Sequence, residues 1–181
     1  MGYAAGSHPA REGRAMRATV ALIAVALLGF VAGTGWVSAQ RSGGSLTAQD
    51  YAEIEQLYAR YNQGVDLRNG EMWLSVFADD GIFQFRDEKY VGQAELAEYR
   101  ARTFARTAGG PDIRHWNGSI VLTPTAEGAE GRAYWIMLDV SSPVPTEVAS
   151  GHYDDVFVKT PAGWRIKVRT GYSDPSSEFA Q

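Results

Sequence analysis

Histidines are the first candidates for chemistry in this chain, because an imidazole gains and loses a proton near neutral pH. Beyond residue 39 the sequence contains only two of them, His115 and His152. Side chains alternate along a strand that begins at Ile113, so His115 shares a face with Ile113 and Asn117. His115 is therefore the better candidate for proton transfer. A hydrogen-bonded histidine in the core or at its rim stays open as the alternative.

Asp66 is a second candidate, because it stands at the apolar end of a predicted helix. A carboxylate that faces an apolar pocket is suited to acid or base catalysis, whereas a solvated one at a helix end, here near Arg68, is only a surface charge. Tyr61 lies five residues earlier, which places the two side chains roughly 140° apart around the helix. Tyr58 lies on the same stripe as Asp66. Which tyrosine faces the pocket stays open, and both are also ordinary core aromatics.

Several other kinds of site are excluded or weakly indicated. The chain contains no cysteine, which excludes thiol catalysis, zinc–thiolate sites and iron–sulfur clusters. It has neither a glycine-rich nucleotide loop nor a Gly-x-Ser-x-Gly nucleophile elbow. His152 and Asp154 share a strand face, but two ligands without a third partner do not define a metal site. We therefore expect neither a metal nor another cofactor.

A long amphipathic helix must position Tyr61 and Asp66. Thr47 is a suitable N-cap, and Asp50 follows three residues later, where a negative charge in the first turn is favourable. The apolar positions of this helix recur every three or four residues, which is the period of one buried helical face. They are Tyr51, Ile54, Leu57, Tyr58, Tyr61 and Val65.

After this helix the pattern changes from helical to extended. Asn69-Gly70 ends the helix, a second short helix covers residues 71–77, and residues 82–85 alternate as a strand. After another short strand, Gly92 opens a third helix to about residue 106. Turn residues then separate four strand-like runs, at 113–123, 131–141, 147–159 and 164–172. This order predicts an α+β domain in which one curved antiparallel sheet wraps around the first helix.

The first 39 residues have the pattern of a secretory signal peptide. Three arginines precede an apolar run over 18–32, and Val37-Ser38-Ala39 suits signal peptidase before Gln40. Met16 is an alternative start that leaves a more ordinary signal. An uncleaved membrane anchor stays open as the alternative, although the run is short for a spanning helix. We expect an exported protein, periplasmic or secreted, that has no membrane association after cleavage.

The mature chain predicted from this cleavage has 142 residues, enough for one domain with its own core. We expect a linker over 40–45, the domain over 46–173 and a polar tail over 174–181. Without the three Arg and one Glu of the signal, 14 basic and 20 acidic residues remain, a net charge of −6. Phosphate backbones attract basic surfaces, so nucleic acid is not an expected partner.

A series of residues in a fixed order carries a family resemblance. It runs from Tyr58 to Asp66, with Trp73, Phe77, Asp80-Gly81 and Phe83, then Gly92, Arg114-His115, Gly151-x-Tyr153-x-Asp155, Gly163-Trp164-Arg165 and Arg169. Over residues 46–172 the chain resembles the SnoaL-like domain, within the nuclear-transport-factor-2-like superfamily. The resemblance implies a cone-shaped α+β fold, in which a bent sheet closes over helices around an apolar pocket. The superfamily includes scytalone dehydratase, bile-acid 7α-dehydratase, ketosteroid isomerase, polyketide cyclases and many non-enzymes, so the fold does not decide the function.

The resemblance also implies roles for particular residues. The dehydratase branch uses a Tyr and an Asp on the first helix and a His on the strand after the third helix, which match Tyr61, Asp66 and His115. Asp139 on the next strand and Arg169 on the last strand are weaker catalytic matches. The signal peptide is a departure from this branch.

The sequence thus supports a cofactor-free lyase, a dehydratase, or an isomerase, acting on a small polycyclic, steroid-like or polyketide-like carbonyl compound. In this hypothesis His115 takes a proton next to the carbonyl, Tyr61 donates a hydrogen bond to the enolate, and Asp66 orients His115 or assists the departing hydroxyl. An exported module that binds a hydrophobic ligand without turnover is the alternative, and a structural dimer is a third. A small hydrophobic molecule and a second copy of the chain are the expected partners. The aromatic surplus suits a flat ligand, and the pocket-lining candidates are Tyr58, Trp73, Phe77, Phe83, Trp135 and Met137.

Overall fold

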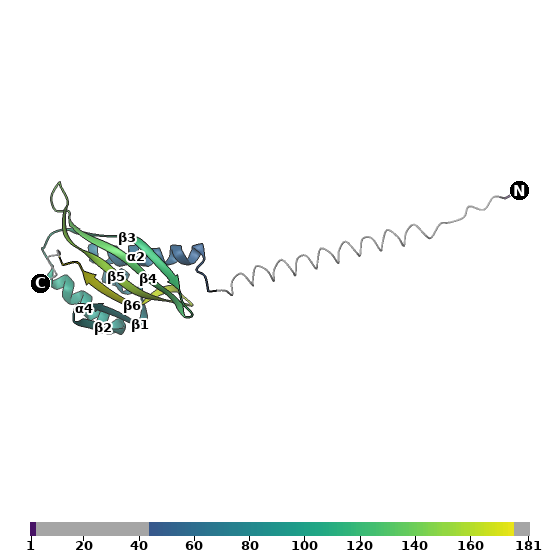
Figure 1. Cartoon of the computed structure of the whole chain (residues 1–181), viewed down its shortest axis with the longest axis horizontal. Helices are drawn as coiled ribbons and strands as arrows, with labels where there is room; N and C mark the ends of the chain where they lie inside the picture. Colours follow the sequence, from purple (N-terminus) through teal and green to yellow (C-terminus); the bar gives the residue numbers. More distant parts are fainter. Residues whose placement is uncertain (3–43, 176–181) are drawn as a thin grey trace. The chain divides into compact units, whose positions relative to one another are not determined.

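The computed structural model describes residues 1–2 and 44–175 (Figure 1). Residues 3–39 of the predicted signal peptide, most of the predicted linker and the end of the predicted tail lie outside the described residues. None of the described helices is long and apolar enough to cross a membrane. The described helices are α2 (Ala48–Asp66), α3 (Gly70–Leu74) and α4 (Gly92–Arg106), and the described strands are β1 (Phe77–Phe85), β2 (Glu88–Val91), β3 (Ile113–Pro124), β4 (Gly128–Asp139), β5 (Thr146–Thr160) and β6 (Gly163–Ser173).

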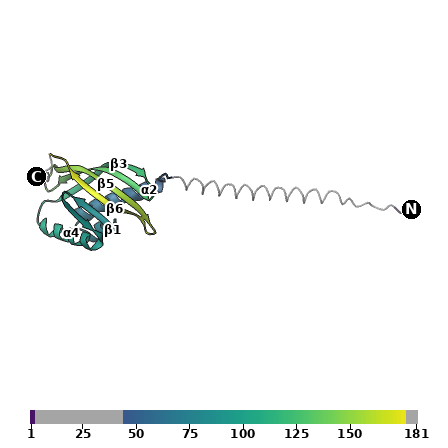
Figure 2. The same ribbon diagram turned by 60° about the horizontal axis from the view of Figure 1, so that its bottom comes forward.

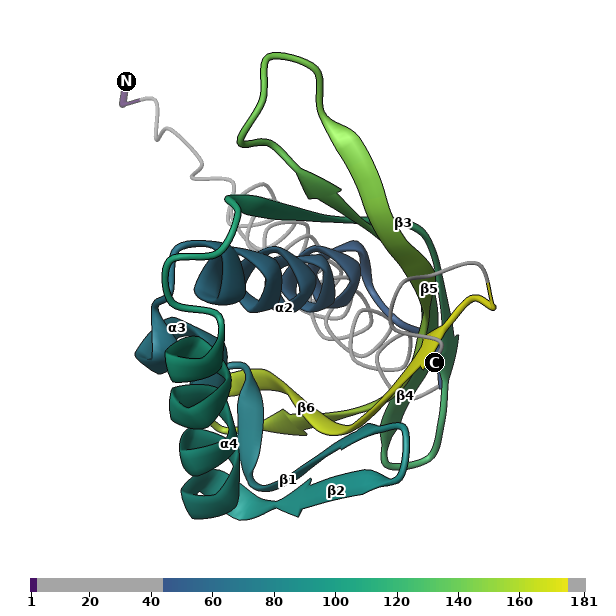
Figure 3. The same ribbon diagram turned by 90° about the vertical axis from the view of Figure 1, so that its left-hand side faces the viewer.

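The strands form one sheet in the order β2-β1-β6-β5-β4-β3. The sheet curves around α2, and α4 covers the side next to β1 (Figures 2 and 3). Neighbouring strands run antiparallel, except that β1 and β6 are parallel, with Phe83 beside Arg169. The predicted α+β class and the cone-shaped sheet around the long helix are confirmed. The parallel pair arises because the last strand of the meander returns to the first strand of the domain.

One boundary difference concerns the second helix, which was expected to reach Phe77. It ends at Leu74, and β1 already begins at Phe77. The physical reason is a hydrogen bond 2.8 Å long from the backbone N–H of Ile166 in β6 to the carbonyl of Val76. Pairing with the last strand therefore draws this segment into the sheet, an effect that the local sequence does not contain.

The start of α2 is fixed by a capping box and by contacts with the β5–β6 hairpin. The Thr47 backbone N–H donates to Asp50 at 2.9 Å, and the Asp50 N–H donates to the Thr47 hydroxyl at 3.2 Å. The Asp50 carboxylate also accepts from Lys159 Nζ at 2.6 Å and Trp164 Nε1 at 2.8 Å. Although burial raises the pKa of Asp50, the hydrogen bonds from Lys159, Thr47 and Trp164 hold that pKa well below its usual range. The carboxylate thus ties the helix to the sheet.

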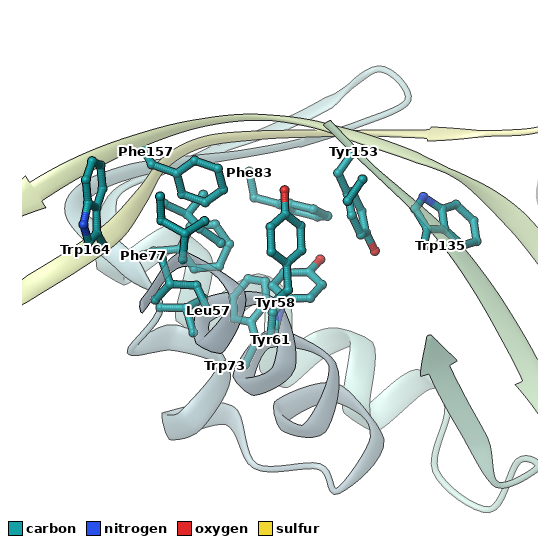
Figure 4. Packing of buried hydrophobic residues seen from close by; sticks show 14 of the residues in the cluster. Leu57, Tyr58, Tyr61, Trp73, Phe77, Phe83, Trp135, Tyr153, Phe157 and Trp164 are labelled. Carbon is teal, nitrogen blue, oxygen red and sulfur yellow. The ribbon is translucent and has the colours of Figure 1, made fainter. Parts of the chain in front are cut away.

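The core between α2 and the sheet is aromatic (Figure 4). Tyr61 is at its centre, with its ring centroid 5.7 Å from those of Trp73 and Tyr153. Trp73 can approach α2 because Gly64 lies against it, and a Cβ at Gly64 would come within 2.7 Å of the Trp73 backbone. These rings come from α2, α3 and β5, so their packing joins the helical layer to the sheet.

A fully buried ion pair lies under these tyrosines. Arg169 Nε and Nη2 each donate to a different carboxylate oxygen of Asp155 at 2.8 Å, and both side chains are 0% exposed. The guanidinium carbon lies 4.8, 4.2 and 4.3 Å from the ring centroids of Tyr58, Tyr61 and Tyr153. The cation therefore has a bidentate counter-ion in its plane and aromatic faces around it, an arrangement that offsets the loss of hydration.

Replacing Asp155 with Asn leaves this guanidinium buried without a counter-charge. We expect Asp155→Asn to lower the free energy of unfolding by about 3 kcal/mol or more, measured by urea unfolding followed through Trp fluorescence. Asp154→Asn is the matched control, because Asp154 forms the same bidentate contact with Arg132, with side chains 39% and 59% exposed. We expect Asp154→Asn to lower the free energy of unfolding by less than about 1 kcal/mol. Equal losses in the two variants would contradict this account of the core.

Candidate active site

A cavity of about 1020 Å³ lies between the end of α2, α4 and the inner face of the sheet. Its volume suits a ligand of a few fused rings. Exposed charged residues from the β1–β2 turn and from the ends of α2 and α4 stand around it, whereas its wall is mainly apolar. The wall residues that are aromatic or aliphatic are Tyr61, Val65, Phe83, Phe85, Tyr99, Phe104, Ile113, Trp135, Met137, Val148 and Tyr153.

The contact between His115 and Asp66 is the main polar feature of this wall. His115 Nδ1 and Asp66 Oδ1 are 2.6 Å apart, and the backbone N–H of His115 donates to Asp66 Oδ2 at 3.0 Å. The side chains are 15% and 6% exposed. With Nδ1–H donating to the carboxylate, Nε2 is the ring atom free to take a proton. The ring is thereby held in one orientation, as expected for a general base.

The local structure explains how these two residues meet. Asp66 is the last residue of α2, and His115 is the third residue of β3. Asn62, one turn before the end of α2, donates from Nδ2 to the His115 carbonyl at 3.3 Å and also to Asn117 Oδ1. The end of the helix is therefore attached to the first residues of the strand by both Asn62 and Asp66.

Tyr61 lines the same cavity as Asp66 and His115. Its ring covers the Arg169 guanidinium, so Arg169 lies behind the tyrosine and does not reach the wall. Tyr153 stands beside Tyr61. Burial, and to a smaller extent the nearby Tyr61, raises the pKa of Tyr153 well above its usual value. Burial likewise raises the pKa of Tyr99 to about 12. Tyr99 and Tyr153 therefore keep their hydroxyl protons at neutral pH and can donate hydrogen bonds.

The structure separates the remaining candidates into two groups. Phe83, Trp135 and Met137 line the cavity, whereas Tyr58, Trp73 and Phe77 are buried in the core away from it. Of the two tyrosines left open, Tyr61 is thus the one that faces the cavity. Asp139 is also away from the wall, at the end of β4, where its carboxylate accepts the backbone N–H of Ser141 at 2.8 Å. That hydrogen bond lowers the pKa of Asp139, which acts as a cap of the turn.

Sequence reasoning missed most of the α4 side of the cavity. Tyr99, Arg100, Thr103 and Phe104 all line it. Arg100 is 5% exposed and stacks on Trp73, with its guanidinium carbon 4.2 Å from the ring centroid. The available signal was a cation four residues after Leu96 and four before Phe104, within an apolar stripe of the helix.

The second histidine lies away from this cavity. His152 stacks on Tyr172 with ring centroids 4.7 Å apart, and Asp154 of the same strand face pairs with Arg132. No group of three or more His, Asp or Glu side chains that could hold a metal ion occurs in the part of the chain that the structure describes.

The domain has the architecture of the nuclear-transport-factor-2-like superfamily, and solved structures agree. A protein of unknown function with a cystatin-like fold from Nostoc punctiforme is 24% identical, covers 74% of this chain and 98% of its own, and superposes with a TM-score of 0.67. A protein of unknown function from Mycobacterium tuberculosis, studied as an Asp-to-Asn variant, is 27% identical, with coverages of 68% and 71% and a TM-score of 0.60.

A candidate scytalone dehydratase from Novosphingobium aromaticivorans is 17% identical, covers 68% of this chain and 83% of its own, and has a TM-score of 0.56. At 17% identity, this similarity concerns the fold alone. A comparison with curated proteins finds no match. The model of the SnoaL-like domain matches residues 46–170, so the chain belongs to the SnoaL-like domain family. This family includes polyketide cyclases and proteins that resemble scytalone dehydratase.

Proposed function

We propose that the protein is a cofactor-free lyase, a dehydratase, or an isomerase that removes a proton next to a carbonyl group of a small polycyclic compound. The contact of His115 with Asp66 at the wall of an apolar cavity carries this proposal. A base needs a defined tautomer and access to the substrate, and the 2.6 Å contact at Nδ1 leaves Nε2 for that purpose.

Asp66 is assigned the role of orienting His115. Both of its carboxylate oxygens already accept hydrogen bonds from His115, one from the ring and one from the backbone. The negative charge also stabilises the imidazolium that forms when Nε2 takes a proton. Of the two roles that the sequence left open for Asp66, these contacts favour orientation over assistance to the leaving hydroxyl.

The proposed reaction begins when His115 Nε2 takes the proton from the carbon next to the carbonyl. The electrons of the C–H bond move to the oxygen, which becomes an enolate, and the Tyr61 hydroxyl donates to it. In a dehydration the enolate then expels a hydroxyl from the adjacent carbon, and His115 returns the proton so that water leaves. In an isomerisation His115 returns the proton to a different carbon of the conjugated system.

Arg169 is proposed to position Tyr61 without contacting the substrate. Its guanidinium lies 4.2 Å from the Tyr61 ring centroid and is itself fixed by Asp155. The attraction between the cation and the ring face holds the tyrosine against the core. Asp139 has no role in this proposal, because its carboxylate caps a turn.

We also propose that the protein acts after export and as a homo-oligomer. The outer face of the sheet exposes large apolar side chains on neighbouring strands, with Trp116 67%, Tyr134 60% and Ile136 38% exposed. Trp116 and Ile136 are paired across β3 and β4. Such a patch suits a contact between two copies of the chain.

Native mass spectrometry of the protein purified from its own host tests these proposals together. We expect an assembly of chains that each begin at Gln40, carrying a bound polycyclic carbonyl compound. Chains that retain the first 39 residues would contradict cleavage, and a monomer at micromolar concentration would contradict the oligomer. A Trp116→Glu variant is expected to dissociate, since it places a charge in the apolar contact.

Turnover is tested with 3-hydroxy-1-tetralone, which gives the fluorescent product 1-naphthol on loss of water. We expect His115→Gln to lower kcat/KM by about 10³-fold and Tyr61→Phe to lower it by about 10²-fold. His152→Gln is the matched control, and we expect it to keep wild-type activity, because His152 stacks on Tyr172 away from the cavity. A fully active His115→Gln variant would contradict the mechanism. Binding of the ketone without any turnover would favour the binding module.

A further inference from the structure

Arg100 is a buried cation that has no counter-ion among residues 44–175. It is only 5% exposed, yet it forms no ion pair and no hydrogen bond with any residue that the structure describes. Its Nε is covered and has no hydrogen-bond partner. A guanidinium carries five N–H donors, and a buried charge without a partner is costly. Arg169 is also buried, at 0% exposure, but it has Asp155 as a bidentate partner.

Aromatic stacking accounts for the position of Arg100 but not for its donors. The guanidinium carbon lies 4.2, 5.2 and 5.3 Å from the ring centroids of Trp73, Tyr99 and Phe104. Ring faces attract the charge, but they do not accept the in-plane N–H groups as an oxygen does. These rings therefore hold the Arg100 guanidinium in place but do not accept hydrogen bonds from its N–H groups.

The open side of Arg100 faces the cavity that contains His115 and Asp66. The negative group at the inner wall, Asp66, is already paired with His115. The other acidic residues around the cavity, Asp87, Glu88 and Asp112, are exposed to solvent and form no ion pair with Arg100. Among the described residues, no side chain of the protein thus neutralises Arg100.

We propose that Arg100 binds a carboxylate of the substrate, so that the natural substrate is a polycyclic carbonyl compound that also carries a carboxylate. A planar guanidinium matches a carboxylate with two parallel hydrogen bonds, and the low polarity of the cavity strengthens them. The inference rests on the proposed function for the reacting carbonyl. It adds an anion-binding anchor on α4 to the cavity whose wall also contains Asp66 of α2 and His115 of β3. It assigns Arg100 to substrate specificity.

The test uses two probes of the same shape and different charge, 2-naphthoate and 2-naphthamide, with the full-length protein and isothermal titration calorimetry. We expect the wild type to bind 2-naphthoate at least about tenfold more tightly than 2-naphthamide, which is the usual strength of a hydrogen-bonded charged contact. We expect Arg100→Gln to remove this preference and Arg100→Lys to retain part of it, because the lysine keeps the charge but not the fork.

Arg86→Gln is the matched control, because Arg86 lines the same cavity but is exposed. It is expected to keep the preference. Equal affinity of the wild type for the two probes, including no detectable binding of either, would overturn the proposal, and this comparison needs no variant to fold. Retention of the preference in a folded Arg100→Gln variant would also overturn it.

The titration, combined with the turnover assay, distinguishes failure of this inference from failure of the proposed reaction. His115→Gln is expected to lose turnover while keeping the preference for 2-naphthoate. If the wild type shows no turnover but prefers 2-naphthoate through Arg100, the anion-binding site stands and the protein is a binding module for aromatic carboxylates.

Discussion

The buried pair of Arg169 and Asp155 is the interaction on which the rest of the domain depends. It joins β5 to β6 at a point where neither side chain meets solvent, and it places a positive charge under the rings of Tyr58 and Tyr61 from α2. The helix is thus held against the concave face of the sheet by an electrostatic contact as well as by apolar burial. One consequence is functional, because Tyr61 is fixed where it forms part of the cavity wall.

A second contact, between Asp66 and His115, attaches the C-terminal end of α2 to the sheet. Asp66 ends α2 and receives two hydrogen bonds from the third residue of β3. The same contact that attaches the helix to the strand also sets the orientation of the imidazole at the cavity. The Asp66 carboxylate therefore has a role both in the fold and in the proposed reaction. Arg100 differs from both pairs, since it is also buried but has neither a counter-ion nor a hydrogen-bond partner among the described residues.

Much of the fold follows from local signals in the sequence, and less of the site does. The period of Ile54, Leu57 and Tyr61 predicted α2, and alternation with turn residues predicted the strands. The parallel pairing of β1 with β6 was not predicted, because it joins residues far apart in the chain. The site shows the same limit. Helical spacing placed Tyr61 and Asp66 on different faces, but Asp66 stands at the helix end, where a side chain reaches β3. The sequence did not reveal Arg100 as a site residue. Its lack of a counter-ion among the described residues depends on where the acidic side chains of all the other elements lie in the folded domain.

The central claim is that His115 removes a proton next to a carbonyl inside the cavity. The most direct measurement is the exchange of the C2 protons of 1-tetralone for deuterium, followed by proton NMR in D₂O with the full-length protein. This ketone has no leaving hydroxyl, so the experiment isolates proton removal from loss of water. The account predicts exchange well above the buffer rate for the wild type, and loss of that excess in His115→Gln. Exchange at the buffer rate for a ketone that binds the cavity, or equal exchange in both proteins, would contradict it.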